Sequence, residues 1–383
     1  MARTARIVTD FATLDERAWA KLDHNDNPFV SHAFLNALEA SGSVTPETGW
    51  QPHHLCLFEN GQLVACAPSY LKSHSHGEFV FDWSWADAYH RHGRNYYPKL
   101  LTAVPYSPVP GPRLLVQKDH PSAKALQDGL VELALSECDT LELSSWHCNF
   151  TPELAVAPKQ AQQLLPRCDW QFHWFNDGYG SFEDFLARLR SKKRKNIRRD
   201  RRLVEEEGIR FVRKTGEQLD DEDLDFIFNC YRTTFLEHGN HPALNRSFFA
   251  QLAELLKSGL LAVLAYREEQ ALAMSLYLVG GGRLFGRYWG CMEHLPGLHF
   301  ETAYHQGIEF CIDQGLDVFE PGAQGEHKLS RGFTPVQTRS YHYVRDPVFR
   351  EAISRYLEQE RAWMKDYRHE LSGRTPFRLD RLA

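Results

Sequence analysis

A short segment near the end of the chain collects residue types suited to acid–base chemistry. Glu326, His327, Lys328 and Arg331 place an acid, a possible base and two cations within six positions. The segment follows an expected strand at 316–319, and ligands of open α/β sheets tend to bind beyond the carboxyl ends of strands. We therefore expect a catalytic cluster with Glu326 or His327 as the base. The alternative is a surface loop with a salt bridge or two.

A second segment, 188–202, holds ten basic residues and one acid. The chain as a whole has a formal net charge of -6, so this density of positive charge is costly without a counter-anion. The segment predicts a helix that binds phosphates, either of a tRNA backbone or of the nucleotide end of coenzyme A. A solvated helix paired with acidic surface groups is the alternative. The expected donor-binding residues are Lys192, Lys193, Arg194, Lys195 and Arg198.

The stretch 296–301 precedes or opens an expected helix at 301–314. Helix N-termini offer free backbone N–H groups and the positive end of a dipole to an anion. This adds His299 and Glu301 to the expected donor site, although the signal is weak alone. The chain has no Gly-rich loop of the dinucleotide or Walker kind, which argues against NAD enzymes and P-loop ATPases.

The first half contains a long aromatic and histidine-rich region that predicts the wall of a substrate cleft. His74, His76 and Glu78 could hold a metal by residue type, as could His90 and His92, but no helical HExxH spacing is present, so we expect none. The aromatics of this region fit a protein core equally well. The expected substrate-binding residues are Glu78, Asp82, Trp85, Tyr96, Tyr97 and Lys99.

Helices and strands follow one another in the same order in both halves, which predicts a duplicated α/β domain. The dipeptide Asn60-Gly61, between strand-like runs at 54–59 and 62–68, is typical of a two-residue hairpin turn. We place the domain boundary in the small-residue stretch 176–180, giving domains 1–178 and 179–383. Further helices are expected at 15–22, 31–40, 123–137, 182–207, 221–236, 247–257 and 347–368, and further strands at 140–144, 261–266, 271–279 and 283–291.

Composition excludes several classes of protein. No apolar run approaches the roughly 18 to 20 residues that cross a bilayer, and the N-terminus lacks the apolar core of a signal peptide, so a cytoplasmic location is expected. The 8 cysteines form no CxxC pair, which argues against structural zinc. The acidic net charge and the absence of RNP-type or KH-type signatures argue against a dedicated RNA-binding protein.

Motifs spread over nearly the whole chain resemble the Fem-like family of predicted N-acyltransferases, also described as peptidoglycan biosynthesis/recognition proteins. In the second half the resemblance rests on the basic run 192–202 and on the glycine-containing segment 320–333. The other matching residues are Pro68-Ser69-Tyr70-Leu71-Lys72, Ser75, Gly77-Glu78, Phe81-Asp82, Trp85-Ala86-Asp87-Ala88-Tyr89, Tyr96-Tyr97-Pro98-Lys99-Leu100, Val104-Pro105-Tyr106, Gly111, Arg113, Phe172-His173-Trp174 and Asn176.

The resemblance implies two tandem GNAT-type acyltransferase domains, each with a central mixed sheet flanked by helices. It also implies direct transfer of an acyl or aminoacyl group to a small-molecule or peptide amine, with Lys328 and Arg331 near the carbonyl or the donor phosphates. Acyl-CoA or aminoacyl-tRNA would be the co-substrate, with no tightly bound cofactor. The chain lacks both the helical arm of some Fem enzymes and the pyrophosphate loop of acetyl-CoA-dependent GNAT enzymes. A non-catalytic peptide or glycan recognition module on the same fold is the alternative.

Overall fold

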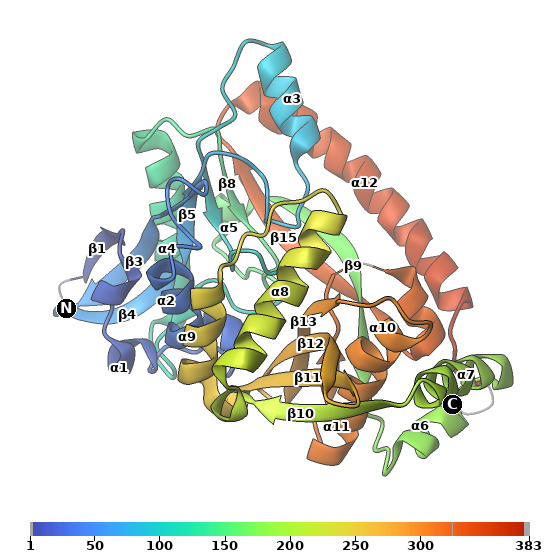
Figure 1. Cartoon of the computed structure of the whole chain (residues 1–383). Helices are drawn as coiled ribbons and strands as arrows, with labels where there is room; N and C mark the ends of the chain where they lie inside the picture. The colour runs from blue at the N-terminus through green and yellow to red at the C-terminus, as the bar shows by residue number, and fades with distance from the viewer. Residues whose placement is uncertain (1–2, 324, 379–383) are drawn as a thin grey trace. The chain divides into compact units, whose positions relative to one another are not determined.

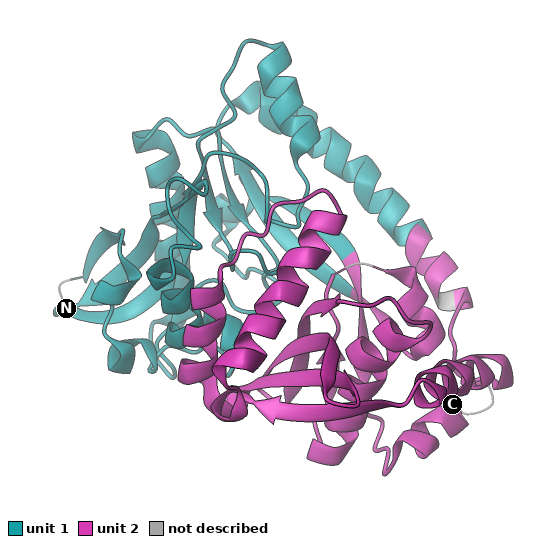
Figure 2. Cartoon of the chain, viewed as in Figure 1, with its two compact units in different colours: residues 1–169, 337–366 teal, residues 170–336, 367–383 magenta. Residues whose placement is uncertain are grey.

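The computed structural model describes residues 3–323 and 325–378, so Gln324 of the 320–333 segment lies outside the described residues. The chain forms two compact units (Figure 2). Unit 1 contains Met1–Asp169 and Gln337–Asp366, and unit 2 contains Trp170–Val336 and Tyr367–Ala383. The expected division at residue 178 assumes two consecutive stretches, whereas the units are interleaved along the sequence.

The interleaving follows from three long elements that run through the division. Strand β9 (Leu165–Phe175), strand β15 (Thr334–Val344) and helix α12 (Pro347–Gly373) each begin in one unit and end in the other. A boundary drawn from small residues misses this, because a strand that serves two units carries no break in its sequence.

Unit 1 contains an antiparallel sheet of order β1-β3-β4-β7 and the strands β8, β6, β5 and β2, which follow β15 in that order (Figure 1). Helix α4 packs its apolar face into the core of this unit through Leu126, Leu130, Val131 and Ala134. The bounds are β1 Arg3–Val8, α1 Glu16–Trp19, α2 His32–Ala40, β2 Trp50–Pro52, β3 His54–Glu59, β4 Gln62–Ala67, β5 Ser69–Lys72, α3 Trp83–Arg91, β6 Lys99–Thr102, β7 Leu115–Val116, α4 Ala123–Thr140, β8 Ser145–Cys148 and α5 Pro158–Ala161.

Unit 2 is built on the strand order β10-β11-β12-β13-β14-β9, with Trp174, Phe185, Leu284 and Phe319 fully buried in its core. The bounds are α6 Phe182–Arg188, α7 Ser191–Glu206, β10 Ile209–Thr215, α8 Asp221–Glu237, α9 Arg246–Leu256, β11 Leu260–Arg267, β12 Gln270–Gly280, β13 Arg283–Cys291, α10 Leu298–Phe300, α11 Gln306–Gln314 and β14 Val318–Glu320. A π-helical turn, Glu301–His305, joins α10 to α11.

The same connection occurs in both units and confirms the expected α/β class with mixed sheets. In unit 1, β6 pairs in parallel with β8, and α4 lies between them in the sequence. In unit 2, β13 pairs in parallel with β14, and α10 and α11 lie between them. Parallel neighbours need such a crossover, which is why each unit inserts a helix at this point.

Several expected elements are confirmed, and others are wrong for physical reasons. Asn60 and Gly61 have φ of 51° and 82°, as a two-residue hairpin turn requires. The strand expected at 140–144 is wrong, because α4 runs on to Thr140 and β8 begins only at Ser145. The expected helix 182–207 is two helices, α6 and α7, that separate at the buried, extended Leu189.

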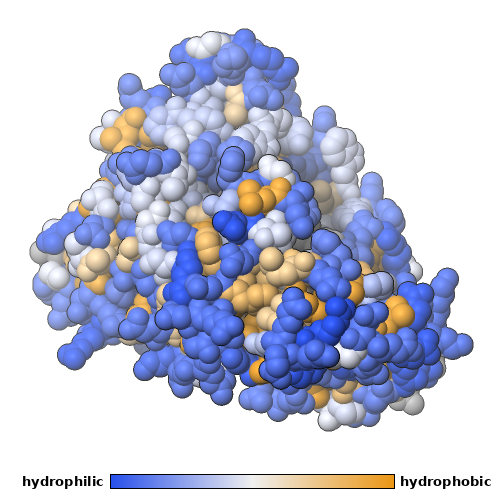
Figure 3. Space-filling model, in the orientation of Figure 1, coloured by the Kyte–Doolittle hydropathy of each residue, from blue (hydrophilic) through white to orange (hydrophobic). Residues whose placement is uncertain are grey.

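The expected long loop of the first half contains regular elements as well. It holds α3 and the short strands β5 and β6. Among the described residues no helix is long and apolar enough to cross a membrane. Hydrophilic residues cover most of the face visible in Figure 3.

Candidate functional site

The basic helix α7 presents one face to the core of unit 2 and its first turns to solvent. Ile197, Asp200 and Val204 are buried and share one side of the helix, at helical spacing. The remaining positions carry the cations, so the sequence buries a narrow stripe and exposes the rest. Positive charge wraps most of the circumference, as the sequence predicts.

The cations of α7 divide into two groups by their partners. Within the described part of the chain, Lys192, Lys193, Arg194 and Lys195 make no ion pair. Arg198, by contrast, pairs with Glu183. The run 192–195 is therefore the part of the helix whose charge is not neutralised by the protein.

Arg201, also in the basic run, forms ion pairs with carboxylates of unit 2. Arg201 lies 3.1 Å from Glu301 and 2.7 Å from Glu309. Glu301 is 2% exposed and also accepts a hydrogen bond from His305 at 2.9 Å. Burial opposes ionisation of Glu301, but His305 and Arg201 lower its pKa. The expected donor-binding role of Glu301 has little support from this position, because its carboxylate is enclosed by internal partners.

The segment after β14 is held by glycines that adopt conformations other residues avoid. The 3-10 helix Glu326–Arg331 begins after Gly325 (φ 116°) and ends at Gly332 (φ 94°). A Cβ atom on Gly332 would lie 2.5 Å from Cζ of the buried Phe185 ring. These two glycines therefore fix the position of His327, Lys328 and their neighbours.

Replacing Gly332 by alanine is therefore expected to destabilise unit 2. The positive φ and the contact with Phe185 together cost about 1–3 kcal/mol of unfolding free energy. Gly373→Ala is the matched control, because no atom lies within 4 Å of its added Cβ. Urea denaturation measures both variants, and equal midpoints would show that Phe185 relaxes without cost.

His327 lies in an aromatic environment that keeps its imidazole neutral. Its Nε2 is 3.0 Å from the hydroxyl of Tyr304, and its ring centroid is 6.4 Å from that of His299. Burial and the nearby charges of Lys328 and Arg331 lower the pKa of His327. Burial and the same neighbours lower the pKa of His299 to about 4. Both rings are therefore available as proton acceptors at neutral pH.

Lys328 is almost completely buried, with 2% exposure. Its ammonium group donates one hydrogen bond, to the backbone carbonyl of Gly322 at 2.7 Å. Burial lowers the pKa of Lys328 to about 7. Arg331 lies 3.3 Å from Asp200 and places its guanidinium 3.2 Å from the centroid of the Phe300 ring. The structure thus brings three of the four expected catalytic residues around one face of this loop.

The lowered pKa of Lys328 gives a pH-dependent stability with a defined sign. Because the unfolded lysine stays protonated up to its ordinary pKa near 10.5, the unfolded state binds more protons between pH 7 and 10. Stability attributable to this site therefore rises with pH across that window. Relative to Lys328→Met, the wild-type protein is expected to gain stability from pH 7 to 10. Urea titrations at both pH values measure this gain, and a difference between the two proteins that stays constant with pH would contradict the lowered pKa of Lys328.

Glu326 points away from this face. Its carboxylate accepts a hydrogen bond from Tyr367 at 2.6 Å and lies 2.7 Å from Arg374. The hydrogen bond from Tyr367 and the charge of Arg374 lower the pKa of Glu326. An exposed, ion-paired carboxylate of low pKa is a poor proton acceptor at neutral pH, so the geometry favours His327 over Glu326 as the base.

A pocket of about 360 Å³ in unit 2 joins the basic helix to the His327 loop. Arg190 and Lys193 line it from the start of the basic helix, and His327 and Ser330 line it from the loop. The remaining lining residues are Glu326, Leu329, Arg374 and Thr375. Cations suited to phosphate and a neutral imidazole suited to proton transfer therefore line one cavity, which we call the basic pocket.

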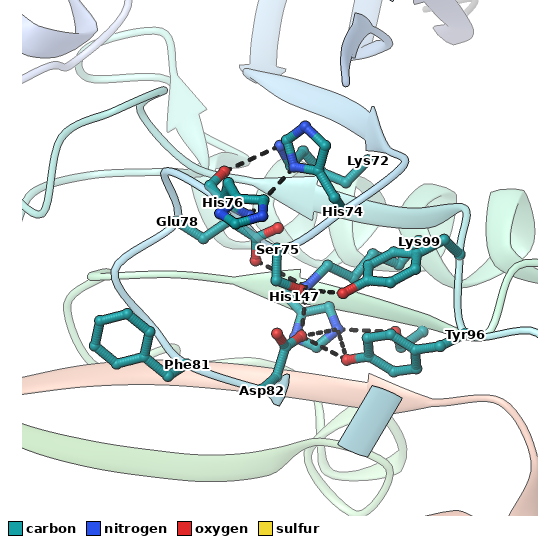
Figure 4. Close-up of polar contacts among 12 residues, drawn as sticks. Lys72, His74, Ser75, His76, Glu78, Phe81, Asp82, Tyr96, Lys99 and His147 are labelled. Carbon is teal, nitrogen blue, oxygen red and sulfur yellow. Dashed lines mark hydrogen bonds and ion pairs between the residues drawn. The ribbon is translucent and has the colours of Figure 1, made fainter. Parts of the chain in front are cut away.

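The expected substrate-binding residues of unit 1 form a buried network rather than an open wall (Figure 4). Lys99 is fully buried and donates to Ser75 at 2.8 Å, to Glu78 at 2.8 Å and to Asp82. Tyr96 donates to Asp82 at 2.6 Å. All three ammonium protons of Lys99 are satisfied, so its role in this conformation is to neutralise two buried carboxylates.

Histidines extend this network. Nδ1 of His147 lies 2.7 Å from Nδ1 of His342, and burial lowers the pKa of both rings. Trp85 is buried against them, with its ring centroid 5.0 Å from that of His342. Tyr97 is half-buried and shares a 2.8 Å hydrogen bond with Ser75. The described residues contain no group of three or more His, Cys, Asp or Glu side chains placed to hold a metal.

Exposed rings lie beside the buried carboxylate of Asp82. Phe81 and Trp83 are 52% and 40% exposed, whereas Asp82 between them is 1% exposed. Arg167 donates to the carbonyl of Phe81 at 2.8 Å and so fixes the segment from the other side. Phe81 and Trp83 are therefore exposed to a ligand, and both are absent from the substrate-binding set expected from the sequence.

Some buried charged groups also lie outside the sets expected from the sequence. Glu320 ends β14 and is 4% exposed, and burial raises its pKa to about 7 against the opposing charge of Arg283. Lys72 is fully buried over the Trp50 ring at 3.6 Å, and burial lowers its pKa to about 7. A charged residue at the end of an apolar strand is the signal that could have found both.

Comparison with known proteins identifies the family. A family model for FemAB-like proteins, described as peptidoglycan biosynthesis/recognition, matches residues 10–379. No curated protein sequence gives a significant match. Among solved structures, FemX shares 11% identity over 92% of this chain and 100% of its own, with a TM-score of 0.53. L-PGS from Bacillus licheniformis shares 10% identity over 84% of this chain and 95% of its own, with a TM-score of 0.50.

A tandem GNAT protein from the clavulanic acid biosynthesis pathway shares 11% identity over 90% of this chain and 99% of its own, with a TM-score of 0.43. At such identities the likeness to FemX and L-PGS shows a common fold. The family match covers both units, the basic helix and the 320–333 segment. The chain therefore belongs to the FemAB-like family.

Proposed function

We propose that the protein is an acyltransferase that moves an acyl or aminoacyl group from a phosphate-bearing carrier to an amine in the basic pocket of unit 2. The observation that carries the proposal is the pocket itself, which Lys193, Arg190 and His327 all line. Membership of the FemAB-like family supports the same class of reaction.

The proposed reaction is direct attack by the amine on the carrier's ester or thioester carbonyl. A C–N bond forms and the C–O or C–S bond to the carrier breaks. Neutral His327 takes the proton released by the amine and returns it to the departing hydroxyl or thiol, so protons balance over one cycle. Lys328 and Arg331 supply positive charge near the oxyanion that forms at the carbonyl.

The unpaired run 192–195 favours a carrier with many phosphates. Successive residues of a helix project about 100° apart, so four consecutive cations cannot all meet one small ligand. A polynucleotide that passes along the helix can contact several of them. Aminoacyl-tRNA is therefore the donor we favour, and acyl-CoA is the alternative that the experiment below must separate.

The donor is tested by thermal shift of the full chain with aminoacyl-tRNA, acetyl-CoA and coenzyme A at low and moderate salt. A ligand that binds only the folded state raises Tm by mass action. Stabilisation by aminoacyl-tRNA that falls with salt, followed by transfer of labelled aminoacyl groups to added amines, supports the proposal. Stabilisation by acetyl-CoA alone identifies the other donor, and no transfer from either donor contradicts the acyltransferase.

Lys193→Gln is expected to weaken tRNA binding, because one cation that meets a phosphate is removed. The slope of log K against log salt should become shallower by about 0.7 to 0.9 for each phosphate that is no longer neutralised. Lys159→Gln, on an exposed position of α5 in unit 1, is the charge-matched control. Filter binding over a salt series measures both slopes. If the slope of Lys193→Gln equals that of the wild-type protein, Lys193 does not contact a tRNA phosphate and tRNA does not bind at the basic pocket.

A second candidate function is non-catalytic recognition of a peptide or glycan by unit 1. It is favoured by the exposed Phe81 and Trp83 beside the buried, ion-paired Asp82. A recognition module should bind cell-wall peptides or glycans without hydrolysing or transferring an acyl group. A slow loss of donor in the absence of any acceptor would argue against it.

A further inference from the structure

Unit 2 contains a second and larger cavity that the proposed reaction does not use. Its volume is about 690 Å³, within the range of roughly 300–1,000 Å³ typical of small-molecule sites. The stretch 176–180 forms one side, and α6 together with Gly332 and Phe377 forms much of the rest. The small-residue stretch that the sequence suggests as a domain boundary is therefore the rim of a cavity.

This rim is held in one conformation by a single side chain. Asn176 donates through Nδ2 to the carbonyl of Leu316 at 3.2 Å and accepts at Oδ1 from the backbone N–H of Tyr179 at 3.0 Å. Its own backbone N–H donates to the backbone carbonyl of Asp317 at 2.8 Å. Gly178, at φ 72°, makes the turn between them. A rim built in this way is preorganised for a ligand, unlike a flexible linker.

Two opposite charges lie in the cavity without forming a closed pair. The guanidinium of Arg188 is 3.7 Å from the carboxylate of Asp177, beyond the 2.7–2.9 Å or so of a charge-assisted hydrogen bond. The side chains of Arg188 and Asp177 are 37% and 74% exposed, so each charged group can still contact a ligand. Asp184 adds a second carboxylate to the lining.

Tyr179 also lines the cavity, and the charges of Asp177 and Arg188 both act on its hydroxyl. Burial raises the pKa of Tyr179, Asp177 raises it further, and Arg188 opposes the rise. The ring packs against Trp174 and Phe185, which anchors this side of the rim to the core of unit 2.

The same cavity has an apolar side. Phe175 ends β9 with its side chain exposed, although phenylalanine is usually buried. Phe377 and Ala187 line the cavity as well. The exposed Phe175 ring, two arginines (Arg188 and Arg378) and two carboxylates define the ligand: it has an apolar part and carries both charges.

We propose that this cavity binds a zwitterionic ligand, a free amino acid or short peptide, with its carboxylate on Arg188, its ammonium on Asp177 and its apolar side chain against Phe175 and Phe377. Two carboxylates balance the two arginines of the lining, Arg188 and Arg378, which disfavours phosphates and other multiply charged anions. The site is independent of acyl transfer and would hold its ligand in a protein with no transferase activity.

Calorimetry on the full chain tests the proposal with four probes: phenylalanine, its amide, N-acetylphenylalanine and the dipeptide Phe-Ala. The amide lacks the carboxylate, and the acetyl derivative lacks the ammonium. Phenylalanine should bind at least tenfold more tightly than either blocked form. Tighter binding of Phe-Ala than of phenylalanine assigns the site to peptides, and the reverse order assigns it to free amino acids. No binding by any probe overturns the proposal.

Two variants assign the charges. Arg188→Gln, combined with Arg378→Gln to remove the second cation of the lining, should bind phenylalanine and its amide equally, because no cation that distinguishes them remains. Asp177→Asn, alone or with Asp184→Asn, should bind phenylalanine and N-acetylphenylalanine equally. Arg355→Gln, an exposed change in unit 1, should leave all affinities unchanged. If both cavity variants still bind phenylalanine more tightly than its blocked forms, the probes bind at another site. Probe binding that survives in His327→Gln separates this site from failure of the transferase proposal.

Discussion

Replacing His327 by glutamine is expected to lower kcat for acyl transfer by about 10²- to 10⁴-fold, the usual contribution of a positioned general base. Glutamine keeps a polar group near Tyr304 but cannot take a proton. In the wild-type protein the pKa of His327 is lowered by burial, Lys328 and Arg331, so the imidazole is neutral at pH 7 and its protonation should lower activity at acidic pH. The variant should lose this acidic limb of the pH profile.

Single-turnover assays with saturating donor measure this effect apart from binding. His294→Gln, at an exposed site of unit 2, controls for the loss of a histidine. Glu326→Gln should have a much smaller effect than His327→Gln, since Glu326 is paired with Arg374. If Glu326→Gln loses more activity than His327→Gln, then Glu326 and not His327 is the general base.

Replacing Lys99 by methionine is expected to cost about 3–5 kcal/mol of unfolding free energy, because it leaves the buried carboxylates of Glu78 and Asp82 without their cation. Burial opposes the charge on Lys99, but the two carboxylates raise its pKa above the ordinary value. The substitution should lower the stability of unit 1, which contains all three residues. Lys124→Met, at an exposed pair with Asp128, should change stability by less than about 1 kcal/mol.

Chemical denaturation followed by near-UV circular dichroism measures both lysine variants. Adding Asp82→Asn to Lys99→Met should recover part of the loss, because one of the two unpaired charges is then removed. An additive result, with no recovery, would mean that the carboxylates find other cations when Lys99 is absent. A small effect of Lys99→Met alone would show that the network is hydrated and its charges are screened.

The sequence alone determined the local features of this protein. Spacing and turn chemistry located the hairpin at Asn60-Gly61 and most of the helices and strands of both units, because these depend on neighbouring residues. Charge density located the basic helix, although not its separation from α6 at Leu189. The Fem-like resemblance, carried by motifs along the whole chain, anticipated the family.

Only the tertiary structure decided which side chains meet. His327 and Lys193 are far apart in sequence and line one pocket, and Glu326, adjacent to His327, lines it as a carboxylate already paired with Arg374. Similarly, Lys99 and its carboxylates fit a substrate wall by residue type but are enclosed in the fold. Burial, hydrogen bonding and pKa depend on contacts between distant segments, and a strand such as β9 that serves two units carries no local mark of its division. Sequence spacing therefore predicts elements, and packing decides their chemistry.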